Sequence, residues 1–161
     1  MQIPLNLKYT KDHEWISIDE KIATVGITDF AQRELGDIVY VEVETVGESL
    51  NTDDIFGTVE AVKTVSDLFL PIAGKIIEFN ESLENTPEDV NNDPYGNGWM
   101  IKIEIDDVNK VGIFDIRPIV ESYVKAENLA NGTDSGSYSG TVASTFKGVD
   151  FNIDKKFPIH I

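Results

Sequence analysis

The sequence predicts a mostly β protein, folded as a β-sandwich or flattened barrel with short flanking helices. Short runs rich in β-branched residues follow one another at close spacing, and Gly, Pro, Asn and Asp separate them. The chain lacks the regular alternation of strands with long helical segments that is typical of a parallel α/β sheet. Together these observations favour packed antiparallel strands.

The N-terminal region is expected to contain a β-hairpin. Residues 13–18 and 21–27 are both rich in strand-forming side chains. The polar pair Asp19-Glu20 lies between the two runs and suits a tight turn.

A brief helix is predicted directly after this hairpin, at residues 28–35. Either Thr28 or Asp29 can cap its first turn, because each side chain offers an oxygen to the free backbone N–H groups. Gly36 then ends the helix.

Further strands are expected in the middle of the chain, where short apolar runs are bounded by turn residues such as Gly47. These runs are residues 38–43, 55–62, 68–70 and 76–79. In the second of them, Ile55, Val59 and Ala61 are predicted to share one face.

A polar stretch and a last strand follow. Residues 80–92 predict a short helix that begins near Pro87, and residues 93–98 are dense in turn formers. Residues 99–105 alternate in polarity, which predicts a half-buried strand. One face of this strand is expected to contain Trp99, Ile101, Ile103 and Ile105. The other face is expected to contain Met100, Lys102 and Glu104.

The domain organisation is expected to be one domain, residues 1–126, followed by a tail, residues 127–161. Residues 117–127 predict a short terminal helix with one apolar face. Residues 131–140 have the small, polar composition of a linker, whereas apolar side chains return in residues 141–161. No role is assigned to the tail, and we expect the function of residues 1–126 to be independent of it.

The charge of the chain restricts its partners. The 161 residues include 13 Lys and Arg against 29 Asp and Glu, a net charge of −16. Such a surface is repelled by nucleic-acid phosphates and by anionic lipid headgroups, and it favours partners with basic docking surfaces.

No apolar run reaches transmembrane length, and the N-terminus lacks the features of a secretory signal. We expect a cytoplasmic protein; a mitochondrial protein after removal of its transit peptide would look the same.

Conventional catalytic and metal sites are not predicted. The chain has no Cys, and its two His, His13 and His160, lie far apart in the sequence. No nucleophile, nucleotide-binding loop or metal-ligand spacing stands out. We therefore expect no catalytic residue and no metal. Any sulfur chemistry must come from an attached group.

Lys63 is the most informative residue, because it lies between two strand-like runs and should project from the tip of a hairpin. Such a side chain, on a rigid platform, can be modified by one enzyme and presented to others. Spacing alone favours the simpler interpretation of an exposed, solubilising lysine.

The residues around Lys63 resemble a known modification site. Glu60-Ala61-Val62-Lys63 with Ser66-Asp67 is similar to the lipoylation site of glycine cleavage system H proteins. Three other blocks resemble the same family in the same order, at residues 9–15, 25–32 with 35–37, and 91–99. The resemblance covers about residues 5–105 and is far more specific than a single short motif.

The resemblance implies a lipoyl/biotinyl-type hybrid β-sandwich that carries lipoate covalently on Lys63. H proteins have no turnover of their own. They shuttle the aminomethyl group of glycine between glycine decarboxylase, aminomethyltransferase and dihydrolipoyl dehydrogenase. A lipoate ligase or transferase attaches the cofactor, and we expect a monomer. The resemblance also implies that Glu14 holds the amine of the loaded arm, with help from Asp67. Glu60 and Asp67 lie three residues before and four residues after Lys63, near the tip, so we expect the attaching enzyme to recognise them.

Other functions are weighed against this one. Biotin carriers have Met on both sides of the modified lysine, whereas Val62 and Thr64 flank Lys63 here. Lipoyl domains of 2-oxo acid dehydrogenases usually have Asp-Lys-Ala at this site and adjoin other domains. A lipoyl relay protein that serves lipoate transfer to other enzymes stays open as an alternative, as does an unmodified acidic binding module.

Overall fold

The computed structural model describes residues 3–4 and 6–107. The helix predicted at residues 117–127 and the tail at residues 127–161 lie outside the described residues. The described residues form two β-sheets, as predicted, with short helices beside them. One sheet has six strands in the order β1-β2-β3-β9-β8-β5, and the other has three in the order β4-β6-β7.

The elements are mostly short. The strands are β1 (Lys8–Tyr9), β2 (Glu14–Asp19), β3 (Ile22–Ile27), β4 (Ile38–Glu42), β5 (Ser49–Leu50), β6 (Ile55–Ala61), β7 (Val65–Phe69), β8 (Gly74–Phe79) and β9 (Ile101–Ile105). The helices are α1 (Asp29–Leu35), the single 3-10 turn η1 (Glu81–Glu84) and α2 (Asp89–Asn92). None of these helices is long and apolar enough to cross a membrane.

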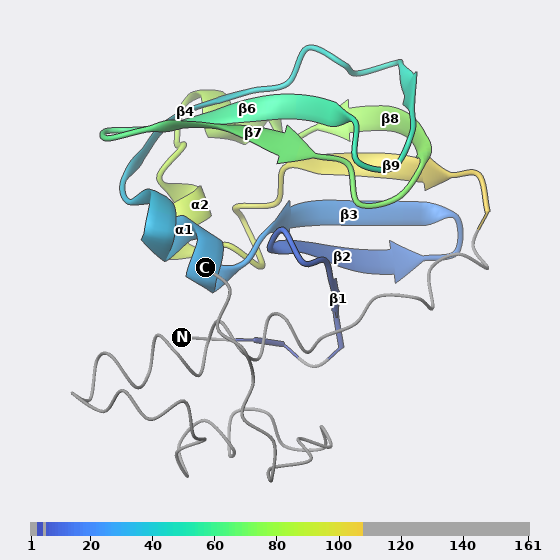
Figure 1. The fold of residues 1–161 in the computed structure, drawn as a ribbon, viewed down its shortest axis with the longest axis horizontal. Coiled ribbons are helices and arrows are strands. Elements are labelled where there is room, and N and C mark those ends of the chain that lie inside the picture. Colours follow the sequence, from blue (N-terminus) through green and yellow to red (C-terminus); the bar gives the residue numbers. More distant parts are fainter. Residues whose placement is uncertain (1–2, 5, 108–161) are drawn as a thin grey trace, which may run out of the picture.

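The two sheets pack face to face, with α1 and α2 together at one end of the sandwich (Figure 1). Apolar side chains from both sheets fill the space between them. Ile16, Val25, Ile76 and Ile103 come from the six-stranded sheet, and Val59 comes from the three-stranded one. Burial of these side chains is the main force that holds the layers together.

The predicted N-terminal hairpin is present as β2 and β3. The strands pair antiparallel from Glu14 opposite Ile27 to Asp19 opposite Ile22. Glu20 adopts φ 56° in the tight connection between them. The two-residue strand β1 pairs with β2 and was not predicted, because so short a segment has no recognisable pattern.

Helix α1 begins and ends where its sequence predicts. The hydroxyl of Thr28 accepts a hydrogen bond from the N–H of Ala31 at 3.1 Å, which satisfies a donor in the first turn. Gly36 ends the helix at φ 83°, a conformation that glycine adopts without steric cost.

The predicted hairpin around Lys63 is formed by β6 and β7. These strands pair antiparallel, and residues 62–64 make the connection at the tip, closed by a 2.8 Å bond from the N–H of Ala61 to the carbonyl of Thr64. The prediction that Ile55 shares a face with Val59 and Ala61 is wrong. The pairing register shifts between Ile55 and Gly57, so that Ile55 is 49% exposed and Phe56 is buried instead.

The last described strand follows its predicted alternation only from Ile101 onward. Ile101, Ile103 and Ile105 are buried as expected. Met100 is fully buried although the alternation placed it opposite these residues. Its N–H donates to the carbonyl of Val25 in the approach to the strand, where the two-residue periodicity does not yet apply. The short helix predicted near Pro87 is present as α2.

We expect Gly26→Ala to destabilise the fold. A Cβ at this position would lie 2.6 Å from the indole of Trp15, its cross-strand partner. The indole is held by a 2.9 Å bond from Nε1 to the carbonyl of Pro94, so it cannot move aside freely. Overpacking of this kind costs about 1–3 kcal/mol of unfolding free energy, which denaturant unfolding measures.

Trp15→Phe provides the control in a double-mutant cycle. The smaller ring leaves room for the new methyl group, so Gly26→Ala should cost less in that background than in the wild type. Equal costs in the two backgrounds would show that the indole is not the obstacle.

Candidate functional site

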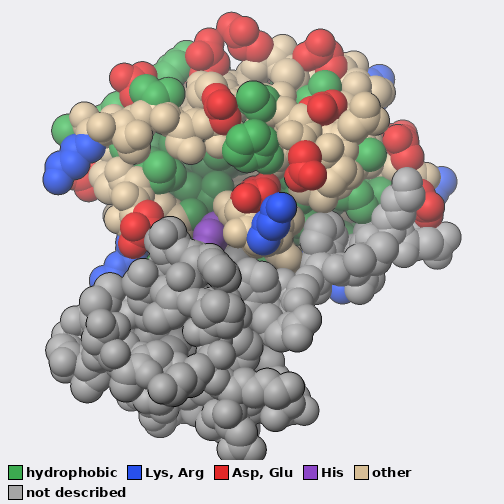
Figure 2. All heavy atoms as spheres, in the orientation of Figure 1, with side chains coloured by type: hydrophobic (Ala, Val, Ile, Leu, Met, Phe, Trp, Pro, Cys, Tyr) green, Lys and Arg blue, Asp and Glu red, His purple; other side chains and the backbone are tan. Residues whose placement is uncertain are grey.

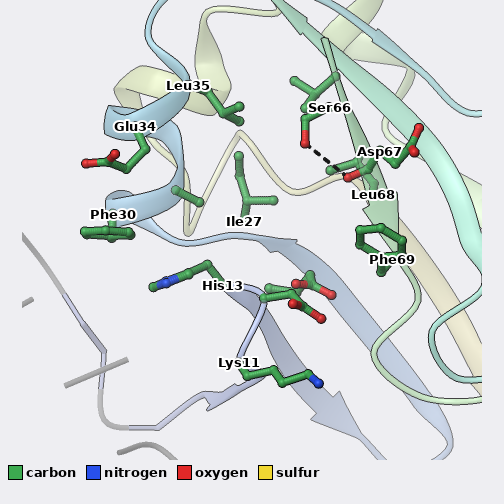
Figure 3. Close-up of a pocket in the computed structure, with 14 residues that line it drawn as sticks. Lys11, His13, Ile27, Phe30, Glu34, Leu35, Ser66, Asp67, Leu68 and Phe69 are labelled. Carbon is green, nitrogen blue, oxygen red and sulfur yellow. Dashed lines mark hydrogen bonds between the residues drawn. The ribbon is translucent and has the colours of Figure 1, made fainter. Parts of the chain in front are cut away.

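A cleft of about 420 Å³ lies beside the Lys63 hairpin. Three segments form its walls: β7, helix α1, and the turn that leads into β2 (Figure 3). Ile27 and Val59 contribute from the two sheets. The cleft therefore joins segments that lie far apart in the sequence.

The lining of the cleft combines an apolar interior with a few polar groups. Apolar side chains come from all its walls, and they are Ile27, Phe30, Ala31, Leu35, Val59, Leu68 and Phe69. The polar and charged lining residues are Lys11, Asp12, His13, Glu14, Glu34, Ser66 and Asp67. An apolar cavity with a few placed polar groups is typical of a site that orients a small organic group.

Glu14 is the buried acid of this cleft. It is the first residue of β2 and only 4% exposed. Burial raises the pKa of its carboxyl to about 7, and the nearby charges of Asp12 and Asp53 add to that rise. A 3.0 Å hydrogen bond from the Thr10 hydroxyl to Oε2 opposes it by stabilising the ionised form. A cation brought into the cleft would favour ionisation of this carboxyl further.

His13 occupies the opposite side of the turn, toward α1. Its ring stacks on Phe30 with 4.5 Å between the centroids, and its Nδ1 lies 3.4 Å from the Thr28 hydroxyl. Burial lowers the pKa of the imidazole to about 4. The ring is therefore neutral at physiological pH and acts as part of the wall of the cleft.

The structure separates the predicted site residues into two groups. Glu14 and Asp67 both line the cleft, and Asp67 belongs to the strand that follows the hairpin tip. Lys63 is exposed at the tip. Its neighbour Val62 is 71% exposed. Glu60 is exposed on β6 between its cross-strand neighbours Tyr40 and Val65, and does not line the cleft.

Several cleft residues were not predicted from the sequence. Phe30 and Leu35 on α1, Phe69 on β7 and Lys11 in the turn all line the cleft. Nothing local distinguishes them from ordinary surface or core residues. Only the pairing of distant strands brings them together.

The surface around the cleft is strongly acidic. Residues 6–107 contain 23 Asp and Glu against 7 Lys and Arg, so this part of the chain carries the whole net charge of −16. Red acidic side chains are prominent around an apolar hollow on the face that Figure 2 shows. Among the described residues, no group of three or more His, Asp or Glu is arranged to hold a metal ion.

Comparison with known proteins gives a consistent result. The family model for the glycine cleavage H-protein matches residues 7–126. A glycine cleavage system H protein from Bacteroides thetaiotaomicron is 62% identical over 104 residues, which cover 65% of this chain and 82% of that protein. The protein of the same name from Salinibacter ruber is 62% identical over 105 residues, 65% of this chain and 85% of the relative.

A solved structure supports the same assignment. The crystal structure of a glycine cleavage system H protein from Mycobacterium marinum matches with a TM-score of 0.63 and 40% sequence identity, over 66% of this chain and 88% of that chain. The family model covers well over half of the sequence. The chain therefore belongs to the glycine cleavage H-protein family.

Proposed function

We propose that this chain carries lipoate in amide linkage on Lys63 Nζ and presents it to the other proteins of the glycine cleavage system. Members of this family are lipoyl carriers, and this chain is a carrier subunit of that system. The observation that carries the residue assignment is the position of Lys63. It is exposed at the tip of a hairpin whose second strand lines a cleft with a buried carboxyl group.

The residues at the tip suit an attachment site. Residues 62–64 are all exposed, so an enzyme can approach Lys63 from several sides. The antiparallel pairing of β6 and β7 beneath the tip holds the lysine backbone in place. When attached, the lipoyl group supplies two sulfur atoms, through which the aminomethyl group of glycine is carried between partners.

Glu14 is the residue that we assign to the carried amine. An ammonium group that enters the cleft can donate a charge-assisted hydrogen bond to this carboxylate, and the apolar lining keeps water from competing for it. Asp67 adds a second negative charge at the cleft. By excluding water, the cleft slows hydrolysis of the carried group while the protein moves between partners.

The partners that we propose are glycine decarboxylase, aminomethyltransferase, dihydrolipoyl dehydrogenase and the enzyme that attaches lipoate. Each must reach Lys63, and the acidic surface of residues 6–107 favours approach by basic docking faces. Family membership favours this function over lipoate relay and over an unmodified binding module.

Lys63→Arg should abolish lipoylation without loss of fold. Arginine keeps the positive charge but lacks the amine nucleophile. Because the side chain is exposed, the change in unfolding free energy should stay within about 0.5 kcal/mol. Intact mass after expression with a lipoate ligase and lipoate measures the modification. Lys75→Arg, at an exposed position on β8, is the matched control and should be modified fully. A lipoylated Lys63→Arg protein would refute the assignment.

Replacing Glu14 should shorten the life of the loaded protein in a pH-dependent manner. Glu14→Gln keeps the size and hydrogen-bonding capacity of the side chain but cannot become a carboxylate. We expect it to accept lipoate normally and, at pH 8, to release ammonia faster than the wild type when the aminomethyltransferase is absent.

The pKa of Glu14 determines how this difference depends on pH. The carboxyl has a pKa of about 7 before the amine enters, and a bound ammonium lowers that pKa. The wild type should therefore lose its advantage over Glu14→Gln as the pH falls below about 7 and Glu14 becomes protonated. Equal lifetimes of the two proteins at pH 8 would show that Glu14 is a bystander.

Charge reversal at Glu60 or Asp67 should slow lipoylation more than it lowers stability. Both side chains are exposed, three residues before and four residues after Lys63. Their replacement by Lys should therefore cost within about 0.5 kcal/mol of unfolding free energy. Glu81→Lys makes the same charge change at an exposed position on η1. Initial rates of lipoylation should fall for Glu60→Lys and Asp67→Lys but not for Glu81→Lys; a similar rate in all three variants would exclude specific recognition of the hairpin acids.

A further inference from the structure

The segment from Asn91 to Trp99 resembles the family closely but contributes no side chain to the cleft. It lies behind α1, the helix that forms one wall of the cleft through Phe30, Ala31, Glu34 and Leu35. Its hydrogen bonds show how this wall is held in place.

Asn91 holds the C-terminal end of α1. Its Nδ2 donates two hydrogen bonds of 2.9 Å, one to Oε1 of Gln32 and one to the carbonyl of Gly36. Its Oδ1 accepts a bond of 2.9 Å from the N–H of Ile38. A single side chain thus bonds to the last turn of the helix, to its end and to the first residue of β4.

The same segment also holds the N-terminal end of α1. The hydroxyl of Tyr95 accepts a 2.9 Å hydrogen bond from the N–H of Asp29, the first residue of the helix. The carbonyl of Pro94 accepts a bond from the indole of Trp15, which follows Glu14 on β2. One loop is therefore bonded both to α1 and to the residue that follows Glu14.

The loop itself is tightly packed. The carbonyl of Asp93 accepts hydrogen bonds from the N–H groups of Gly96 and Gly98, and its carboxylate accepts one from Asn97. A Cβ at Gly96 would collide with the carboxylate of Asp93, and one at Gly98 would lie 2.6 Å from the carbonyl of Asp89. The glycines thus permit a close-packed support for α1.

The end of α1 is connected in turn to the hairpin tip. The carbonyl of Asp37 accepts a 3.1 Å hydrogen bond from the N–H of Val62, the residue before Lys63. Asp37 lies between Gly36 and Ile38, the two residues whose backbones bond to Asn91. Asn91 is therefore connected to the residue before Lys63 by two successive hydrogen bonds, one to Gly36 and one between Asp37 and Val62.

We propose that Asn91 is a positioning residue. Through α1 and Asp37, it holds the wall of the cleft in register with the Lys63 hairpin, so that the carried amine meets the carboxylate of Glu14. Tyr95 does the same at the other end of the helix. The effect on the carried amine rests on the proposed function, whereas the effect of Asn91 on the positions of α1 and the hairpin does not involve lipoate.

The first test uses the full-length unmodified protein. Hydrogen exchange of Asn91→Ala should be faster by about tenfold in residues 30–38 and at Val62, because three hydrogen bonds that oppose local opening are lost. Asn80→Ala is the matched control. Asn80 also makes three side-chain hydrogen bonds, to the carbonyls of Asn97 and Trp99 and to the hydroxyl of Ser82, but none to α1.

In the control, exchange should be faster around residues 80–82 and 97–99 and unchanged in α1. Unchanged exchange in α1 of Asn91→Ala, or an equal increase there in Asn80→Ala, would overturn the proposal.

The second test uses the lipoylated, loaded protein. Asn91→Ala should release ammonia about fivefold faster than wild type in the absence of the aminomethyltransferase, the effect expected from the loss of about one net hydrogen bond. Asn80→Ala should release ammonia at the wild-type rate, even if its thermal midpoint falls as far as that of Asn91→Ala.

Glu14→Ala serves as the reference in this second test. If it accelerates release and Asn91→Ala does not exceed the control, the positioning proposal is wrong and the proposed function stands. If Glu14→Ala has no effect, the proposed role of the cleft fails, and the exchange experiment alone decides whether Asn91 holds α1 and the hairpin together.

Discussion

The pairing of β3 with β9 is the contact on which the rest of the structure depends. It joins Ala23 to Ile103 and Val25 to Ile101 across nearly the whole described chain. The N-terminal hairpin, which contains Glu14, is held through this pairing in the same sheet as β8 and β5. The Lys63 hairpin belongs to the other sheet, which packs against this one. The cleft therefore depends on this long-range pairing together with the packing of the two sheets.

The cleft buries an ionisable group, Glu14, at a cost in stability. The carboxyl of Glu14 is 4% exposed and has a pKa near 7. Its charged form is therefore less stable in the cleft than it would be in water. The Thr10 hydroxyl compensates in part. A cation that enters such a site interacts with the carboxylate at a lower local dielectric than at an exposed acid. Burial of Glu14 is consistent with a binding role and has no evident benefit for stability.

Local features of the fold could be predicted from the sequence. The β2–β3 hairpin, the Thr28 cap and the Gly36 end of α1 depend on residues close to one another in the chain, and the structure confirms them. The predictions for Ile55 and Met100 were wrong, because a register shift and the approach to a strand depend on the partner strand. A periodic pattern in one segment contains no information about such irregularities.

The candidate site was predictable only through resemblance. Spacing alone gave Lys63 no more weight than any exposed lysine, and only the family motif singled out Glu14. The apolar lining from Phe30, Leu35 and Phe69 was not predicted, because these side chains meet through tertiary contacts. The bonds of Asn91 to α1 were likewise not predictable, since they join residues more than fifty positions apart.

The hairpin that bears Lys63 has a further electrostatic property. Between Ile55 and Phe69 the charged residues are Glu60, Lys63 and Asp67. Conversion of the lysine amine into an amide removes the single cation of this segment and leaves two acids. The unmodified tip therefore presents mixed charge, whereas the acylated tip is purely anionic. Since exposed charges act over about one Debye length, an enzyme with a basic docking face can distinguish the two forms before it touches the attached group.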